Sequence, residues 1–129
     1  MRVLHLTLKA KFFDMIASGE KLEEYRALTD YWGARLCYRI PVPKVGGYFT
    51  KWMKLREGDR ECLNDTSFPN FAEYDVIRFA RGGHFHSSVP QMTVQFKEIK
   101  IGTGKPEWGA EPGKEYFVIK LGEIITPGG

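Results

Sequence analysis

Cysteine, long apolar runs and a strong charge of either sign are all scarce in this chain. Its 129 residues include only two cysteines, Cys37 and Cys62, which are too few for a disulfide scaffold and lack the paired spacing of a zinc site. No apolar run is long enough for a membrane span or a signal peptide. We therefore expect a cytoplasmic protein with reduced thiols and no membrane partner. The formal net charge of +3 permits an anionic partner without requiring one.

The length and the 43% hydrophobic content are those of a chain that closes one core, so we expect a single domain over residues 1–129. Prolines, glycines and aromatic residues alternate over about 40–71, which predicts an irregular excursion packed on the body of the domain. Six lysines and arginines fall in 39–60 against Glu57 and Asp59. This stretch is either an electrostatic footprint or a solvated loop.

The first third of the chain predicts two strands and two short helices. Residues 3–9 alternate between apolar and polar side chains, the period of a half-buried strand. The period then changes to that of a helix ending at Ser18-Gly19. Residues 21–26 are expected to be extended. Thr29 or Asp30 is a suitable cap for a second helix that runs to about Leu36.

The remainder predicts three further strands, over 74–80, 91–101 and 115–125, of which the first two form a hairpin. Apolar residues change parity after Phe96, which predicts a β-bulge near Lys97-Glu98. Five mostly antiparallel strands with two short helices near the N-terminus indicate an α+β, mainly β fold, and specifically a small barrel.

Charge is concentrated in one unusual place, because five of the seven residues from Glu20 to Arg26 are charged between two elements that both have core patterns. Burying such groups without partners would cost several kcal/mol, on the order of the penalty for unsatisfied ions. They therefore pair with one another or line a wet cleft, unless they lie on an exposed edge strand whose charges discourage aggregation.

The order Gly19, Lys21, Glu24, Arg26 resembles the Gly-x-Lys-x-x-Glu-x-Arg signature of the ASCH domain family, which is related to the PUA and EVE domains. All four positions match, and the preceding strand and helix also look like the opening of these proteins. The resemblance implies a PUA-like barrel. It also implies a cleft beside the signature that accepts RNA or a modified nucleoside, with DNA as a further possibility.

The same resemblance raises an enzymatic alternative. One branch of the family hydrolyses the amide of acetylated cytidine and another is described as ribonuclease-like, so a hydrolase would use Lys21 and Glu24 as its catalytic pair. The amidohydrolase branch has a threonine at the position of Glu24. This chain follows the more general signature there, which argues against that particular reaction.

Other side chains are secondary candidates for contact with the ligand. Tyr31 or Trp32 would stack on unpaired bases, since both lie close to the charged stretch. His84 and His86 have a spacing compatible with metal ligands, but no third ligand is evident, and we expect neither a metal nor an organic cofactor. The predicted ligand-binding residues are Lys9, Lys21, Glu24, Arg26, Tyr31, Trp32, Arg35 and Arg78.

Overall fold

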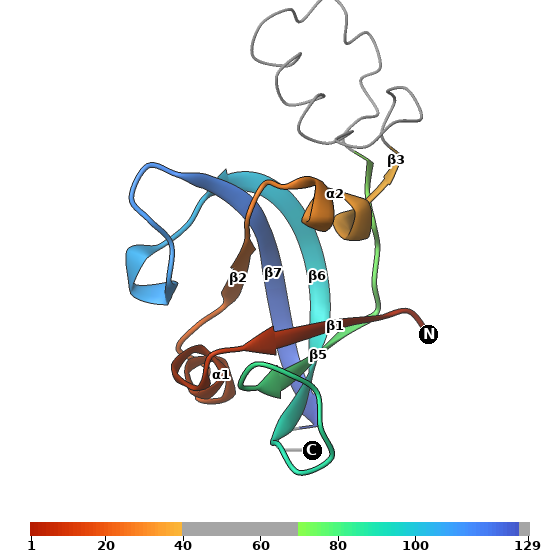
Figure 1. Ribbon diagram of the computed structural model, residues 1–129, viewed down its shortest axis with the longest axis vertical. Coiled ribbons are helices and arrows are strands. Elements are labelled where there is room, and N and C mark those ends of the chain that lie inside the picture. The colour runs from red at the N-terminus through yellow and green to blue at the C-terminus, as the bar shows by residue number, and fades with distance from the viewer. Residues whose placement is uncertain (40–69, 127–129) are drawn as a thin grey trace, which may run out of the picture.

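The computed structural model describes residues 1–39 and 70–126 (Figure 1). The predicted excursion over 40–71, with most of the basic stretch and Cys62, lies almost wholly outside these residues. No helix in the described ranges is long and apolar enough to cross a membrane. The elements, in chain order, are β1 (Val3–Leu8), α1 (Ala10–Ala17), β2 (Glu23–Arg26), α2 (Asp30–Leu36), β3 (Cys37–Arg39), β4 (Asn70–Phe71), β5 (Val76–Arg81), β6 (Gln91–Thr103), the 3-10 helix η2 (Pro106–Trp108) and β7 (Glu115–Thr126).

Five of the strands form one mixed sheet in the order β1-β5-β6-β7-β2, and the short strands β3 and β4 pair separately. β1 runs parallel to β5, while the other neighbours are antiparallel. The sheet curls into a half-barrel, as the curved course of β6 and β7 shows (Figure 1). The predicted mainly β fold with five strands and two short helices is thereby confirmed. Because β1 and β2 are the two ends of the strand order, no backbone ladder joins them.

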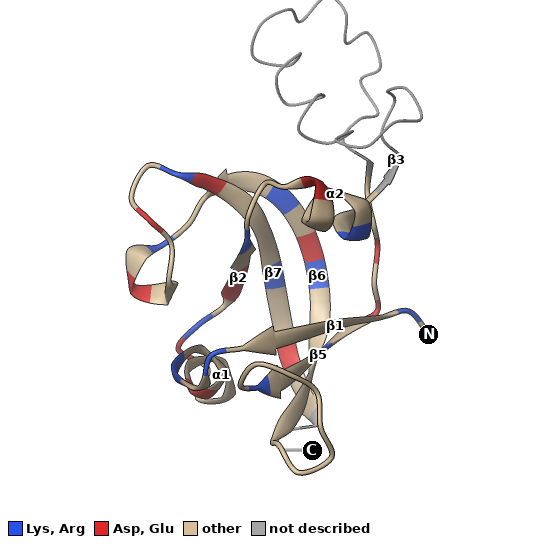
Figure 2. Ribbon diagram, viewed as in Figure 1, with Lys and Arg blue, Asp and Glu red and all other residues tan. Residues whose placement is uncertain are grey.

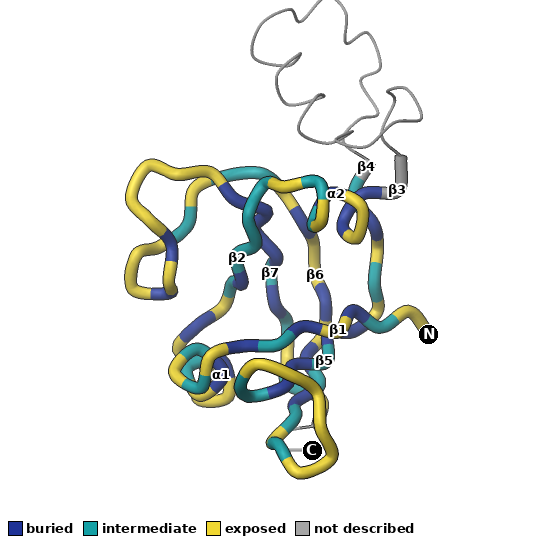
Figure 3. The backbone as a smooth tube through the Cα atoms, in the orientation of Figure 1, coloured by how far each residue is buried: buried dark blue, intermediate teal, exposed yellow. Residues whose placement is uncertain are grey.

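The core lies inside the curl of the sheet, where buried segments follow the strands while the connecting loops are mostly exposed (Figure 3). In β1 the burial alternates, and Leu4, Leu6 and Leu8 point inward as the sequence period predicts. β7 differs, because its four consecutive residues 116–119 are all buried. A strand with neighbours on both sides and both faces covered has such a continuous apolar run.

Local signals placed the element ends correctly in several cases. Gly19 adopts a φ of +84° just after α1, the left-handed conformation that favours glycine at a helix stop. The Thr29 side chain accepts a hydrogen bond from the Trp32 backbone N–H at 3.3 Å and caps α2. The register of β6 against β7 shifts between Phe96 and Glu98, which confirms the predicted bulge. The strand expected from Lys21 begins two residues later, at Glu23.

Cys37 is a buried, free cysteine at the start of β3. Burial raises the pKa of its thiol to about 12, so the thiol stays protonated at neutral pH.

The connection between β6 and β7 folds back against β2. The Lys105 backbone N–H donates to the Tyr25 hydroxyl at 2.9 Å. Gly104 lies so close to the same ring that a Cβ atom placed there would be 2.6 Å from Tyr25 Cε1 and 2.8 Å from the Cβ of Ala110. Only glycine, which has no Cβ atom, allows the backbone at position 104 to lie this close to the Tyr25 ring. We call residues 104–114 the η2 loop.

This contact predicts a difference between two glycines that are two residues apart. Gly104→Ala should lower the free energy of unfolding by about 1 to 3 kcal/mol, the usual cost of overpacking, because Tyr25 or the loop must move. Gly102→Ala is the control, since nothing lies within 4 Å of its added methyl group. Urea denaturation of both variants measures the difference. Equal stability of the two would show that the loop is not packed on Tyr25.

Candidate functional site

Lys21 is among the largest fully buried side chains of the described residues, with only 1% of its surface exposed. Its Nζ donates to Glu24 Oε1 at 3.0 Å and to the main-chain carbonyl of Trp108 at 2.9 Å. The rings of Phe12 and Tyr25 lie 5.0 and 5.1 Å from the same nitrogen. Burial lowers the pKa of Lys21, and the charge of Glu24 opposes that effect. The lysine therefore joins the η2 loop to β2 through the two hydrogen bonds of its Nζ.

Glu24 and Arg26 extend this contact to the other edge of the sheet. Glu24 Oε2 accepts a hydrogen bond from Arg26 Nη2 at 2.6 Å, and the same nitrogen donates to the main-chain carbonyl of Thr7 at 2.8 Å. Thr7 belongs to β1, so one guanidinium group bridges the two edge strands that no backbone ladder joins. Behind it, the Trp32 ring centroid lies 4.9 Å from the guanidinium carbon. We call Lys21, Glu24 and Arg26 the ion network.

Arg26 retains unused donor capacity. Its Nε is buried and has no hydrogen-bond partner in the described part of the chain. A buried unsatisfied donor costs about 1 to 3 kcal/mol, so this nitrogen marks a strained point in an otherwise paired cluster. Such groups are rare in native proteins, and each one calls for an explanation, such as strain or a functional role.

A pocket of about 200 Å³ lies between the two edges of the sheet, beside the ion network. We call it the seam pocket. The C-terminal end of β1 and the residue after it form one wall of the pocket. α1 and the η2 loop contribute aromatic side chains, and β2 contributes the carboxylate and the guanidinium group. The lining residues are Thr7, Leu8, Lys9, Phe12, Glu24, Tyr25, Arg26, Trp108 and Gly109.

The predicted site residues divide into three groups. Lys9, Glu24 and Arg26 line the seam pocket, whereas Lys21 lies beneath it and is not on its surface. Trp32 lies against Arg26 and contributes no lining.

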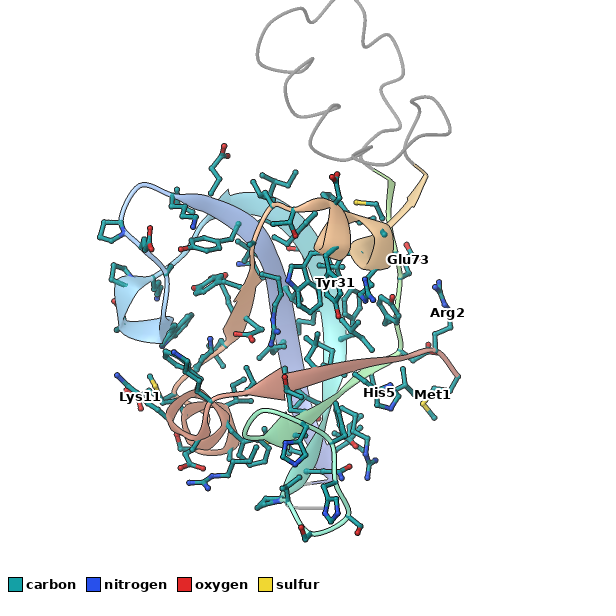
Figure 4. All side chains as sticks on the ribbon, viewed as in Figure 1. Met1, Arg2, His5, Lys11, Tyr31 and Glu73 are labelled. Carbon is teal, nitrogen blue, oxygen red and sulfur yellow. The ribbon has the colours of Figure 1, made fainter. Side chains whose placement is uncertain are left out.

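The other three predicted residues are elsewhere. Tyr31 is 57% exposed on α2, where it projects from the helix (Figure 4), and the Arg35 guanidinium stacks on its ring at 3.5 Å. Arg78 on β5 donates to the side chains of Gln91 and Thr93 on β6. None of these three lines the seam pocket.

Six lining residues were not among the predicted site residues, namely Thr7, Leu8, Phe12, Tyr25, Trp108 and Gly109. Phe12 and Thr7 occur in apolar and alternating patterns that indicate only a helix and a strand. Only Trp108 could have been recognised from the sequence as a candidate lining residue, because it is a large aromatic residue in a loop rich in glycine and proline. Its position over Lys21 depends on contacts 87 residues apart in the chain, which no local pattern specifies.

Comparison of the chain with models of protein families, with curated proteins and with solved structures gives no significant match. Among the described residues, no group of three or more His, Cys, Asp or Glu side chains is placed to hold a metal ion. His84 and His86 lie near each other, with ring centroids 6.3 Å apart, and His86 Nδ1 is hydrogen-bonded to Ser88.

The buried ion network predicts strong coupling between its members. Glu24→Leu should lower the free energy of unfolding by about 3 to 5 kcal/mol, because Lys21 and Arg26 would lose their shared counter-charge. Adding Lys21→Met should restore part of this loss, since the double variant buries one unpaired charge fewer. Chemical denaturation of both single variants and the double variant gives the coupling energy.

The control is the exposed pair of Asp14 and Arg81, whose side chains are 58% and 40% exposed at a 3.0 Å separation. Removing that pair by Arg81→Gln should change stability little, because water screens exposed charges. Additive losses in the Lys21 and Glu24 variants would contradict the network.

Proposed function

We propose that the seam pocket binds a nucleobase, either within single-stranded RNA or as a free nucleoside. The observation that carries the proposal is the composition of the pocket wall. Three aromatic residues, Phe12, Tyr25 and Trp108, share one small pocket with the carboxylate of Glu24 and the guanidinium of Arg26. Proteins recognise unpaired bases by this combination of stacking surface and convergent polar groups.

The size of the pocket favours a single ring system. Its volume of about 200 Å³ is below the roughly 300 to 1,000 Å³ typical of sites for drug-sized ligands. A planar heterocycle suits such a space better than a whole nucleotide or a peptide side chain with its backbone. Ribose and phosphate would then remain outside the pocket.

The charges support a ligand that offers a donor and an acceptor side by side. Each oxygen of Glu24 holds one hydrogen bond from the ion network and keeps lone-pair capacity for another. The guanidinium group of Arg26 lines the same pocket. A carboxylate beside a guanidinium is complementary to an amide-like base edge, which carries an N–H next to a carbonyl or ring nitrogen.

The likeness to the ASCH signature points in the same direction. Gly19 ends α1, and the other three signature residues form the ion network. The hydrolase alternative receives less support from this geometry, because Lys21 is 1% exposed and both Glu24 and the Trp108 carbonyl engage its ammonium group. A lysine in that state is an anchor for the pocket wall and not a free nucleophile.

The proposal is tested by calorimetric titration of the protein with the four common nucleosides, acetylated cytidine and a short single-stranded RNA at low salt. We expect at least one base to bind, and Trp108→Leu to weaken that binding by about 1 to 3 kcal/mol, the value of one stacking contact. The substitution keeps the main-chain carbonyl that Lys21 uses. Tyr31→Leu is the matched control, because Tyr31 is an exposed aromatic residue outside the pocket.

A second variant guards against a loss of packing in Trp108→Leu. Thr7→Val replaces the hydroxyl group of a lining residue by a methyl group of similar size. The variant keeps the main-chain carbonyl that Arg26 uses, so it should fold normally. The order of the affinities for the different bases should change. Failure of the folded wild-type protein to bind any of these ligands would refute the proposal. Release of acetate from acetylated cytidine, or cleavage of the RNA, that stops in Lys21→Ala would replace it by the hydrolase alternative.

A further inference from the structure

A second pocket lies on the other side of β2, and its wall is unusually basic. Its volume is about 360 Å³. Glu23 faces it, whereas the next residue, Glu24, faces the seam pocket, as expected for successive residues of a strand. We call it the lysine pocket. Its lining residues are Leu22, Glu23, Lys97, Lys105, Trp108, Lys120 and Leu121.

Three lysines and one glutamate give this lining a formal charge of +2. Among the described residues, Lys120 is the only one of the three lysines with a carboxylate partner, since its Nζ lies 2.7 Å from Glu23 Oε2. This pair also fixes Glu23: burial raises the pKa of the carboxyl, but hydrogen bonds from Lys120 and Tyr25 and the charges of Lys120 and Lys100 lower it overall. The single acidic group of the pocket is therefore ionised and already occupied at neutral pH.

Lys97 and Lys105 are left without a carboxylate. Both are exposed, and within the described ranges no ion pair is found for either one. The Lys105 ammonium lies 4.5 Å from the centroid of the Trp108 ring, which holds it against the pocket wall without neutralising it. Lys97 and Lys120 come from adjacent strands, and Figure 2 shows basic positions in the middle of both β6 and β7.

Two unneutralised ammonium groups on one concave lining repel each other and focus a positive potential into the pocket. An anion that accepts from both would remove that repulsion. A phosphate group fits this requirement, because its oxygens accept several charge-assisted hydrogen bonds at once and lysine meets it as a point charge.

The position of the pocket indicates which phosphate group it would bind. Trp108 lines both pockets, so the two pockets are neighbours at this residue. A base held in the seam pocket leaves its ribose and phosphates outside, and Lys97 and Lys105 offer a basic surface on the other side of Trp108. We infer that the lysine pocket is a phosphate subsite, which takes the phosphodiester of the RNA strand next to the base in the seam pocket. The inference rests on the proposed function and extends it from a base to a strand.

The experiment measures two affinities of the protein as a function of salt concentration. One is its affinity for a short single-stranded RNA, and the other is its affinity for the free nucleoside that binds it most tightly. For the RNA, Lys97→Gln and Lys105→Gln should each reduce the slope of log affinity against log salt by about 0.7, the value of one contact with a single strand. Free nucleoside has no phosphate, so its affinity should be unchanged in both variants.

Lys114→Gln is the matched control. Lys114 is in the η2 loop like Lys105, is exposed and also packs on an aromatic ring, at 5.3 Å from the Tyr116 centroid, but it does not line either pocket. It should leave both the RNA slope and the nucleoside affinity unchanged. Titration with inorganic phosphate gives a direct measurement of anion binding, when the backbone amide NMR signals of Lys97 and Lys105 are recorded at each step.

The outcomes separate the two proposals. If nucleosides bind but the RNA slope responds equally to Lys105→Gln and Lys114→Gln, the phosphate subsite is refuted while the base pocket stands. If phosphate binds through Lys97 and Lys105 but no nucleoside binds, the base pocket is refuted. Polyglutamate that binds through the same lysines as tightly as RNA would refute the phosphate assignment and indicate an acidic peptide partner.

Discussion

The contact between Glu24 and its two cations is the interaction on which the rest of the site depends. The five-stranded sheet ends in two edges, and neither edge pairs with the other through its backbone. Glu24 joins Arg26, which reaches the carbonyl of Thr7 on β1, and Lys21, which reaches the carbonyl of Trp108 in the η2 loop. One carboxylate thus organises three segments that are distant in the sequence.

This arrangement explains why a pocket exists at the seam. A barrel closed by a backbone ladder would bring β1 and β2 to about 4.8 Å, the usual separation of neighbouring strands, and leave no space between them. Closure by long side chains holds the edges farther apart and leaves polar groups on the walls of the gap. The same ion network therefore stabilises the half-barrel and contributes Glu24 and Arg26 to the pocket wall, so residues that support the fold also line the pocket.

Local patterns were sufficient for much of the fold. The alternation in β1, the glycine after α1, the Thr29 cap and the parity change in β6 each depend on neighbouring residues, and each was predicted from them. The charged stretch after α1 was also recognised as exceptional, and three of its residues, Glu24, Tyr25 and Arg26, line the pocket.

Features that depend on distant contacts were not accessible in this way. Charge and spacing alone place Lys21 on a ligand surface, because lysine is rarely buried. Its actual position beneath the pocket depends on a carbonyl 87 residues away. The choice of Tyr31 as a stacking residue was based on closeness in sequence, whereas the aromatic wall is assembled from α1, β2 and the η2 loop, which meet only in the folded chain.

The way in which Lys21 holds the η2 loop has a consequence for how such a site can diversify. Its partner in the loop is a main-chain carbonyl, which every amino acid provides, and not the indole of Trp108. The residue at position 108 can therefore be exchanged during evolution without removing the anchor. Because this residue lines both pockets, a single substitution changes the walls of both, while the residues that hold the scaffold together stay the same.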